Sequence, residues 1–71
     1  MKIKYLIQCG NFKAICLSEN AKTAVLEATQ FITSKYKLGH TFVVRPIGRL
    51  DMVWEFDAIK VFKWASWEIS K

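Results

Sequence analysis

The stretch Asn20-Ala-Lys-Thr-Ala-Val-Leu-Glu-Ala-Thr-Gln-Phe-Ile-Thr-Ser-Lys-Tyr36 decides the fold that we predict for this chain. Its small and apolar residues recur at the spacing of one helix face. These residues are Ala21, Ala24, Val25, Ala28, Phe31, Ile32 and Tyr36. We therefore expect a helix over residues 20–36, with Asn20 or Ser18 as its N-cap and Gly39 as the left-handed residue that stops it. A helix with one apolar face needs a sheet to pack against.

Two strands joined at Gly10-Asn11 precede this helix. Gly and Asn tolerate the positive φ of two-residue hairpin turns, so the turn sets the register of the two strands. On one side Cys9 then faces Phe12, Ile7 faces Ala14, Tyr5 faces Cys16 and Ile3 faces Ser18, and this side is the predicted core face. The second face carries Leu6, Ile15 and Leu17 among charged residues. Because solvent exposure does not explain such an apolar face, we expect a partner or the carboxyl-terminal segment to cover it.

A second hairpin is predicted after the helix. Residues 41–47 form its first strand, which lies at an edge or finishes at Pro46, and residues 52–56 return after a turn over residues 48–51. Pairing Ile47 with Met52 sets Arg45 against Trp54 and Val43 against Phe56. Arg45 then either stacks on the Trp54 ring as a cation–π pair or extends into solvent.

Residues 57–69 fit a helix better than a strand. A helix capped by Asp57 places apolar residues on one face and an aromatic, basic set on the other. The apolar face holds Ala58, Val61, Phe62, Ala65 and Ile69, and the opposite side holds Lys60, Lys63, Trp64 and Trp67. The predicted fold is α+β over a single domain, residues 1–71: an antiparallel sheet of two hairpins, a central helix on one face (ββαββ) and a carboxyl-terminal helix. The strand order stays open.

The composition indicates more apolar surface than one small chain can hide. Apolar residues make up 52% of the sequence, with three Trp, two Tyr and five Phe, in a chain of 71 residues. No apolar run approaches the ~20 residues of a membrane span, and the amino end lacks the features of a signal peptide. We therefore expect a cytoplasmic protein that associates with itself. The net charge of +5 also favours acidic partners, although the bases are scattered.

No sequence motif indicates a particular catalytic or binding chemistry. Cys9 and Cys16 lie about 13 Å apart along the predicted ribbon, so we expect free thiols, and His40 alone cannot complete a zinc site with them. Glu55 and Asp57 alternate onto one face but read more simply as solvated neighbours than as a catalytic pair. The serines and glycines form no nucleophile motif, phosphate loop or dinucleotide fingerprint. We predict no catalytic, cofactor-binding or metal-binding residues, no small-molecule substrate and no enzyme activity.

Two hypotheses for function remain. In the first, the chain is a structural or interaction module that forms a homo-oligomer through Trp54, Trp64 and Trp67 or through the second face of the first hairpin. In the second, it binds nucleic acid. Phosphates would then contact Arg45, Arg49, Lys60 and Lys63, and unpaired bases would stack on the same tryptophans. We favour the first hypothesis because the sequence lacks a dense basic stripe.

The amino-terminal half resembles a group of viral proteins. The hairpin Ile7-Gln-Cys-Gly-Asn-Phe-Lys13 and the helix entry Glu19-Asn-Ala-Lys-Thr-Ala-Val25 are similar to small uncharacterised proteins of tailed phages, marine cyanophages among them. The resemblance covers roughly residues 1–36. It implies an intracellular viral accessory protein, in the host cytoplasm, and carries no functional residues over to this chain.

Overall fold

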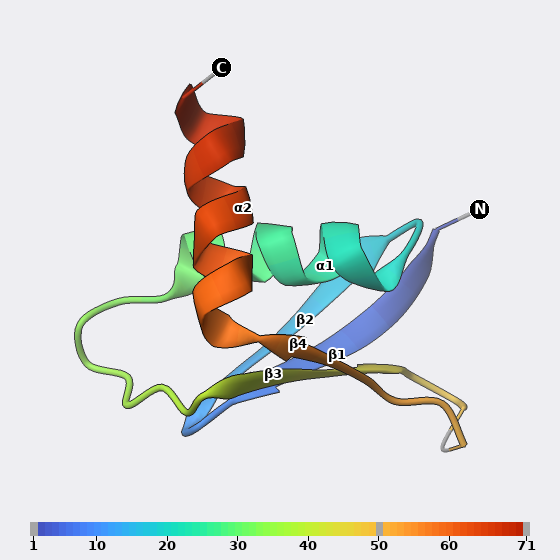
Figure 1. Cartoon of the computed structure of the whole chain (residues 1–71). Coiled ribbons are helices and arrows are strands. Elements are labelled where there is room, and N and C mark those ends of the chain that lie inside the picture. The colour runs from blue at the N-terminus through green and yellow to red at the C-terminus, as the bar shows by residue number, and fades with distance from the viewer. Residues whose placement is uncertain (1, 50, 71) are drawn as a thin grey trace.

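The computed structural model describes residues 2–49 and 51–70 and has the predicted α+β architecture (Figure 1). In chain order its elements are β1 (Ile3–Cys9), β2 (Phe12–Ser18), α1 (Ala21–Ala28), a short 3₁₀ helix η1 (Thr29–Phe31), β3 (Thr41–Pro46), β4 (Trp54–Asp57) and α2 (Ala58–Ser70). The strands form one antiparallel sheet in the order β2-β1-β3-β4. The two hairpins therefore join through β1 and β3, which are the internal strands.

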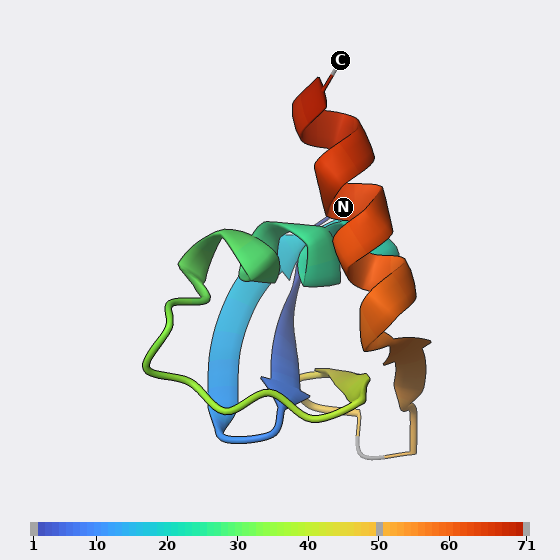
Figure 2. The same ribbon diagram turned by 60° about the vertical axis from the view of Figure 1, so that its left-hand side comes forward.

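Both helices pack on the same face of the sheet (Figure 1). Between them and the sheet lies a core in which Ile7, Phe42 and Val44 from the internal strands meet Val25 of α1 and Val61 of α2, all of them fully buried. The far end of α2 extends away from the sheet beyond α1 (Figures 1 and 2). Among the described residues, no helix or strand covers the other face of the sheet.

The register predicted for the first hairpin is confirmed. Tyr5 pairs with Cys16, Ile7 with Ala14 and Cys9 with Phe12. Gly10 has a φ of 61° and Asn11 has no positive φ, the combination found in type II′ turns. Strand residues therefore alternate between a buried face toward the helices and a face away from them.

The tip of this hairpin is tied to the connection between η1 and β3. The Asn11 amide donates to the Lys37 carbonyl at 3.0 Å, and the Lys37 amide donates to the Asn11 side-chain oxygen at 2.7 Å. The Cys9 thiol donates to the Gly39 carbonyl at 3.5 Å. These bonds hold the connection beside the β1–β2 turn (Figure 2), so it needs no helix or strand of its own.

The central helix is confirmed, but its predicted length is wrong. Asn20 caps it, because its side chain accepts the Thr23 amide at 2.8 Å, yet α1 ends at Ala28 and η1 continues only to Phe31. The chain then leaves the helix, which lets Tyr36 reach the core and meet the Phe12 ring edge-on at 5.0 Å. Phe31, predicted on the core face, is 62% exposed instead. Gly39 does not have a positive φ and stops no helix.

The register predicted for the second hairpin is wrong by one residue. Val44 pairs with Trp54 and Phe42 with Phe56, in place of Arg45 with Trp54 and Val43 with Phe56. A one-residue slip moves every side chain to the other face of the sheet. The observed pairing turns Phe42, Val44, Trp54 and Phe56 toward the helices, where their apolar surface is covered. Arg45 therefore lies on the face opposite to Trp54, and the proposed cation–π pair does not form.

The remaining predictions for the second hairpin and the last helix have mixed outcomes. Strand β3 ends at Pro46, as predicted, whereas β4 begins only at Trp54. The predicted helix over residues 57–69 is confirmed from Ala58 onward as α2, whereas Asp57 is the last residue of β4. The Asp57 side chain accepts the Ile59 amide at 2.9 Å as the predicted cap. Ala58 and Val61 are buried as expected. Leu50 of the predicted turn and the side chain of Ile69 lie outside the described residues.

Candidate protein interface on the open sheet face

The face of the sheet that points away from both helices, here called the open face, is unusually apolar. Ile15 is 62% exposed, Leu17 55%, Ile47 53% and Val53 45%. The strand registers place Ile15 and Leu17 on the open face, together with the half-buried Leu6 and Val43. The same alternation carried one residue beyond β3 and one residue before β4 adds Ile47 and Val53. An antiparallel sheet with one solvated face ordinarily carries polar side chains there. Solvation alone therefore does not explain the composition of the open face.

The registers order the side chains of the open face into rows that cross the sheet. One row runs through Lys13, Gln8, Val43 and Glu55, from β2 across β1 and β3 to β4. The next row contains Ile15, Leu6 and Arg45, and the same register carried one residue beyond β4 adds Val53. Leu17 pairs with Lys4, whose carbonyl accepts the Ile47 amide at 2.9 Å, so these three form a third row. Apolar side chains thus extend from β2 across β1 to β3, and Val53 continues them just before β4.

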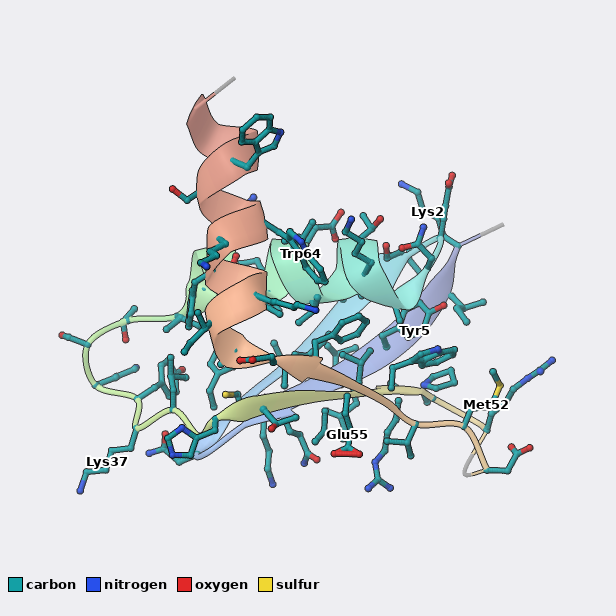
Figure 3. All side chains as sticks on the ribbon, viewed as in Figure 1. Lys2, Tyr5, Lys37, Met52, Glu55 and Trp64 are labelled. Atoms are coloured by element: carbon teal, nitrogen blue, oxygen red, sulfur yellow. The ribbon has the colours of Figure 1, made fainter. Side chains whose placement is uncertain are left out.

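Charges on the open face are separated by strand. Lys13 lies on β2, Lys4 on β1 and Arg45 on β3, whereas the carboxylates Glu55 and Asp57 lie on β4. Figure 3 shows Glu55 on the side of the sheet opposite to Tyr5 and Trp64. The Asp57 carboxylate is engaged in capping α2 at the end of its strand. Within the strands, the open face is therefore basic toward β2 and acidic toward β4, with apolar residues between the two.

The three tryptophans do not share one exposed patch. Trp54 packs edge-on against Tyr5 at 6.0 Å and Trp64 edge-on against Phe56 at 6.0 Å, both partly buried beside the core. Trp64 was predicted on the outer side of the last helix. It is covered because α1 lies beside α2, with the Lys22 ammonium 4.7 Å from the Trp64 ring centre. Trp67, farther along α2, is exposed.

The basic residues predicted to contact phosphates lie on different surfaces. Arg45 lies on the open face, and Arg49 lies in the β3–β4 connection, where its guanidinium is 3.8 Å from the Met52 sulfur. Lys60 and Lys63 are on α2, which packs on the opposite face of the sheet. The structure therefore does not bring these four residues together into one basic surface.

Glu55 and Asp57 differ in their surroundings. Glu55 is exposed opposite Val43, whereas the Asp57 carboxylate accepts the Ile59 amide. Within the described residues, no group of three or more His, Cys, Asp and Glu side chains is placed to hold a metal ion. None of the described helices is long and apolar enough to cross a membrane.

Both cysteines are free and buried, as predicted. Burial raises the pKa of the Cys9 thiol, and burial together with the nearby Glu27 carboxylate raises the pKa of the Cys16 thiol. The folded state therefore favours the neutral thiols. Burial therefore disfavours a reactive thiolate at both positions.

These raised pKa values predict a loss of stability in alkaline solution. Unfolded thiols ionise near their ordinary pKa of about 8.5, whereas the folded thiols stay protonated to higher pH. The free energy of unfolding should be fully retained below about pH 8.5 and should fall as the pH rises toward the folded pKa. Urea unfolding between about pH 7 and 10 measures this slope. We expect a shallower slope for Cys16→Ala than for the wild type, and equal slopes would contradict the assignment.

Sequence reasoning found half of the open face. Leu6, Ile15 and Leu17 were recognised from the first hairpin, whereas Val43, Ile47 and Val53 were missed. The signal that could have found Val43 is its neighbour Phe42, because burial of the larger aromatic side chain leaves Val43 on the other face of the strand.

Comparison with protein-family models found no match, and comparisons with curated proteins and with solved structures found no significant one. The resemblance to tailed-phage proteins therefore stays a prediction.

Proposed function

We propose that this chain is a non-enzymatic interaction module that associates with itself through the open face. The observation that carries the proposal is the gathering of Ile15, Leu17, Ile47 and Val53, all exposed, on one uncovered sheet face. Exposed apolar patches of this kind mark sites of protein association. The open face contains no tryptophan, tyrosine or phenylalanine among the described residues, so it does not provide the stacking platform of a single-strand binder.

The free cysteines bear on the cellular compartment of this module. Free, buried Cys9 and Cys16 suit a reducing compartment, which supports a cytoplasmic protein. If the resemblance of residues 1–36 to tailed-phage proteins holds, that cytoplasm is the host cell's, and the module is a viral accessory protein.

Replacing Ile15 by lysine should weaken self-association at least tenfold. Ile15 lies within the apolar rows, and a buried ammonium there loses hydration without a partner, at a cost of about 1.4 kcal/mol or more. Sedimentation equilibrium of the wild type and of Ile15→Lys, over a range of concentrations, measures the effect. The matched control is Ile59→Lys, since Ile59 is exposed to a similar extent, 68% against 62% for Ile15, but lies on α2.

The control should leave association unchanged, and both variants should keep the wild-type circular dichroism spectrum. The proposal fails if the wild type is monomeric throughout, or if the two variants weaken association equally. Titration with a single-stranded oligonucleotide at two salt concentrations tests the nucleic-acid hypothesis beside it. A monomer that binds the oligonucleotide, with an affinity that falls steeply with salt, would replace the proposal.

A further inference from the structure

We infer that the open face pairs with the open face of a second copy about a two-fold axis that runs parallel to the strands, between β1 and β3. In this dimer Lys13 of each copy lies opposite Glu55 of the other. The inference rests on the proposed function and deepens it, because it adds the number of copies, their relative orientation and the residues that determine both.

The first step is the position of the two charges in one chain. Lys13 and Glu55 are both exposed and lie in the same row, at its two ends, because Gln8 pairs with Lys13 and with Val43, and Val43 pairs with Glu55. Three strand spacings of about 4.8 Å separate them by roughly 14 Å. The two side chains are thus too far apart to pair within one chain.

The second step compares the two ways in which identical sheets can face each other about a two-fold axis with their strands aligned. An axis parallel to the strands lays β2 of one copy over β4 of the other and keeps every row level with itself. Lys13 then meets Glu55 of the second copy, and the symmetry makes this contact twice. An axis perpendicular to the strands lays β2 over β2 and β4 over β4, which brings bases over bases and acids over acids. The charges therefore favour the parallel axis.

The third step asks whether the apolar rows agree with this arrangement. In the row of Ile15, Leu6, Arg45 and Val53, the same axis sets Ile15 over Val53 and Leu6 over the aliphatic stem of Arg45. An arginine can cover apolar surface with its stem while its charged end reaches the rim. Facing sheets pack about 10 Å apart, a gap that a lysine and a glutamate span together at the edge.

The size of the open face sets the affinity to expect. Four strands span about 19 Å across the sheet, so each copy contributes a small interface. Small interfaces are typical of weak and transient complexes. We expect a dissociation constant in the range of about 1 to 100 µM, which concentration-dependent measurements can resolve.

Charge exchange tests the arrangement. Lys13→Glu places two glutamates at each contact, and Glu55→Lys places two lysines there, so each variant should dimerise at least tenfold more weakly. The double variant Lys13→Glu/Glu55→Lys restores both contacts with the signs exchanged and should return to within about threefold of the wild type. Mixing the two single variants should give a heterodimer, since the two acidic side chains of the Lys13→Glu chain then face the two basic side chains of the Glu55→Lys chain.

The control for net charge is Lys63→Glu, on α2, which changes the charge of the chain as Lys13→Glu does and should leave dimerisation unchanged. Both Lys13 and Glu55 are exposed, so the variants should fold, and circular dichroism checks this. Sedimentation equilibrium gives the dissociation constants. A wild type that is monomeric at all concentrations overturns both this inference and the proposed function.

A different result would overturn this inference and leave the proposed function standing. If Ile15→Lys weakens the wild-type association but the charge variants do not, the open face is the interface and the inferred axis is wrong. Failure of both the double variant and the mixture to restore association overturns the axis in the same way, as does an assembly larger than two copies.

Discussion

Replacing Gly10 by alanine is expected to destabilise the fold by about 3 kcal/mol or more, a large part of what a domain of this size possesses. Two effects combine at this position. Gly10 has a φ of 61°, which costs a residue with a Cβ about 1 kcal/mol or more. A Cβ at Gly10 would also lie 2.0 Å from the Lys37 carbonyl oxygen, 2.8 Å from the Gly39 nitrogen and 2.9 Å from the Leu38 carbonyl carbon. All three are backbone atoms, so no side chain can rotate away.

The clash acts on the bonds that hold the hairpin tip to the connection before β3. To admit the methyl group, Lys37 must retreat from the turn, which breaks the two Asn11–Lys37 hydrogen bonds at about 1 kcal/mol each. Alanine variants of the other two glycines distinguish the cost of the positive φ from the cost of the clash. Gly48 has a φ of 97° with nothing within 4 Å of an added Cβ, so Gly48→Ala should cost only the backbone strain. Gly39→Ala meets nothing closer than 3.4 Å and should be nearly neutral.

Urea unfolding followed by tryptophan fluorescence measures the three glycine variants. The expected order of destabilisation is Gly10→Ala well above Gly48→Ala, with Gly39→Ala smallest. If Gly10→Ala costs no more than Gly48→Ala, the close approach of Lys37 to the turn is not part of the native structure.

The first hairpin was predictable because its turn is local. Gly10-Asn11 permits only a few two-residue turns, and each of them gives the same pairing of the flanking strands. The cap at Asn20 was predictable for the same reason, since the side chain and the amide that it accepts are three residues apart. Wherever a few neighbouring residues determine the geometry, the sequence was sufficient.

The predictions were wrong where contacts between residues far apart in the sequence determine the structure. The helical spacing continues to Tyr36, but Tyr36 reaches Phe12 from an irregular segment that is tied to Asn11, a partner far away in the sequence. In the second hairpin the connection is longer than the predicted turn, because β4 begins at Trp54. Its register follows from the need to turn Trp54 and Phe56 toward the helices, which requires knowing where the helices lie.

In the candidate interface, too, only the part that neighbouring residues determine could be predicted. Leu6, Ile15 and Leu17 could be placed on one face from the first hairpin alone. Whether that face is covered could not be predicted, because it depends on which side of the sheet receives α2. The rows that cross all four strands also depend on the pairing of β1 with β3, which joins the two hairpins and has no signature in either of them.

Truncation of Phe42 to alanine should destabilise the fold by about 3–5 kcal/mol. Phe42 is fully buried in the internal strand β3, between the sheet and both helices, and its ring meets that of Phe62 edge-on at 5.7 Å. Replacing a buried phenylalanine by alanine costs about 3–5 kcal/mol through lost burial and the cavity that remains. A chain of 71 residues has roughly 4–10 kcal/mol of stability in total, so the loss should leave the native state barely populated at the low end of that range.

Two other phenylalanines provide matched controls for the same change in chemistry. Phe31→Ala removes an exposed ring and should change the free energy of unfolding by less than about 0.5 kcal/mol. Phe62→Ala removes the partner ring from the partly exposed side of α2 and should have an intermediate effect, including about 0.5–1.5 kcal/mol for the ring pair. If Phe42→Ala does not fold, Phe42→Leu takes its place, because leucine keeps most of the buried volume and the protein should stay folded. Because Phe42→Leu/Phe62→Ala then closes a double-mutant cycle, a coupling near zero would show that the two rings do not contact each other in solution.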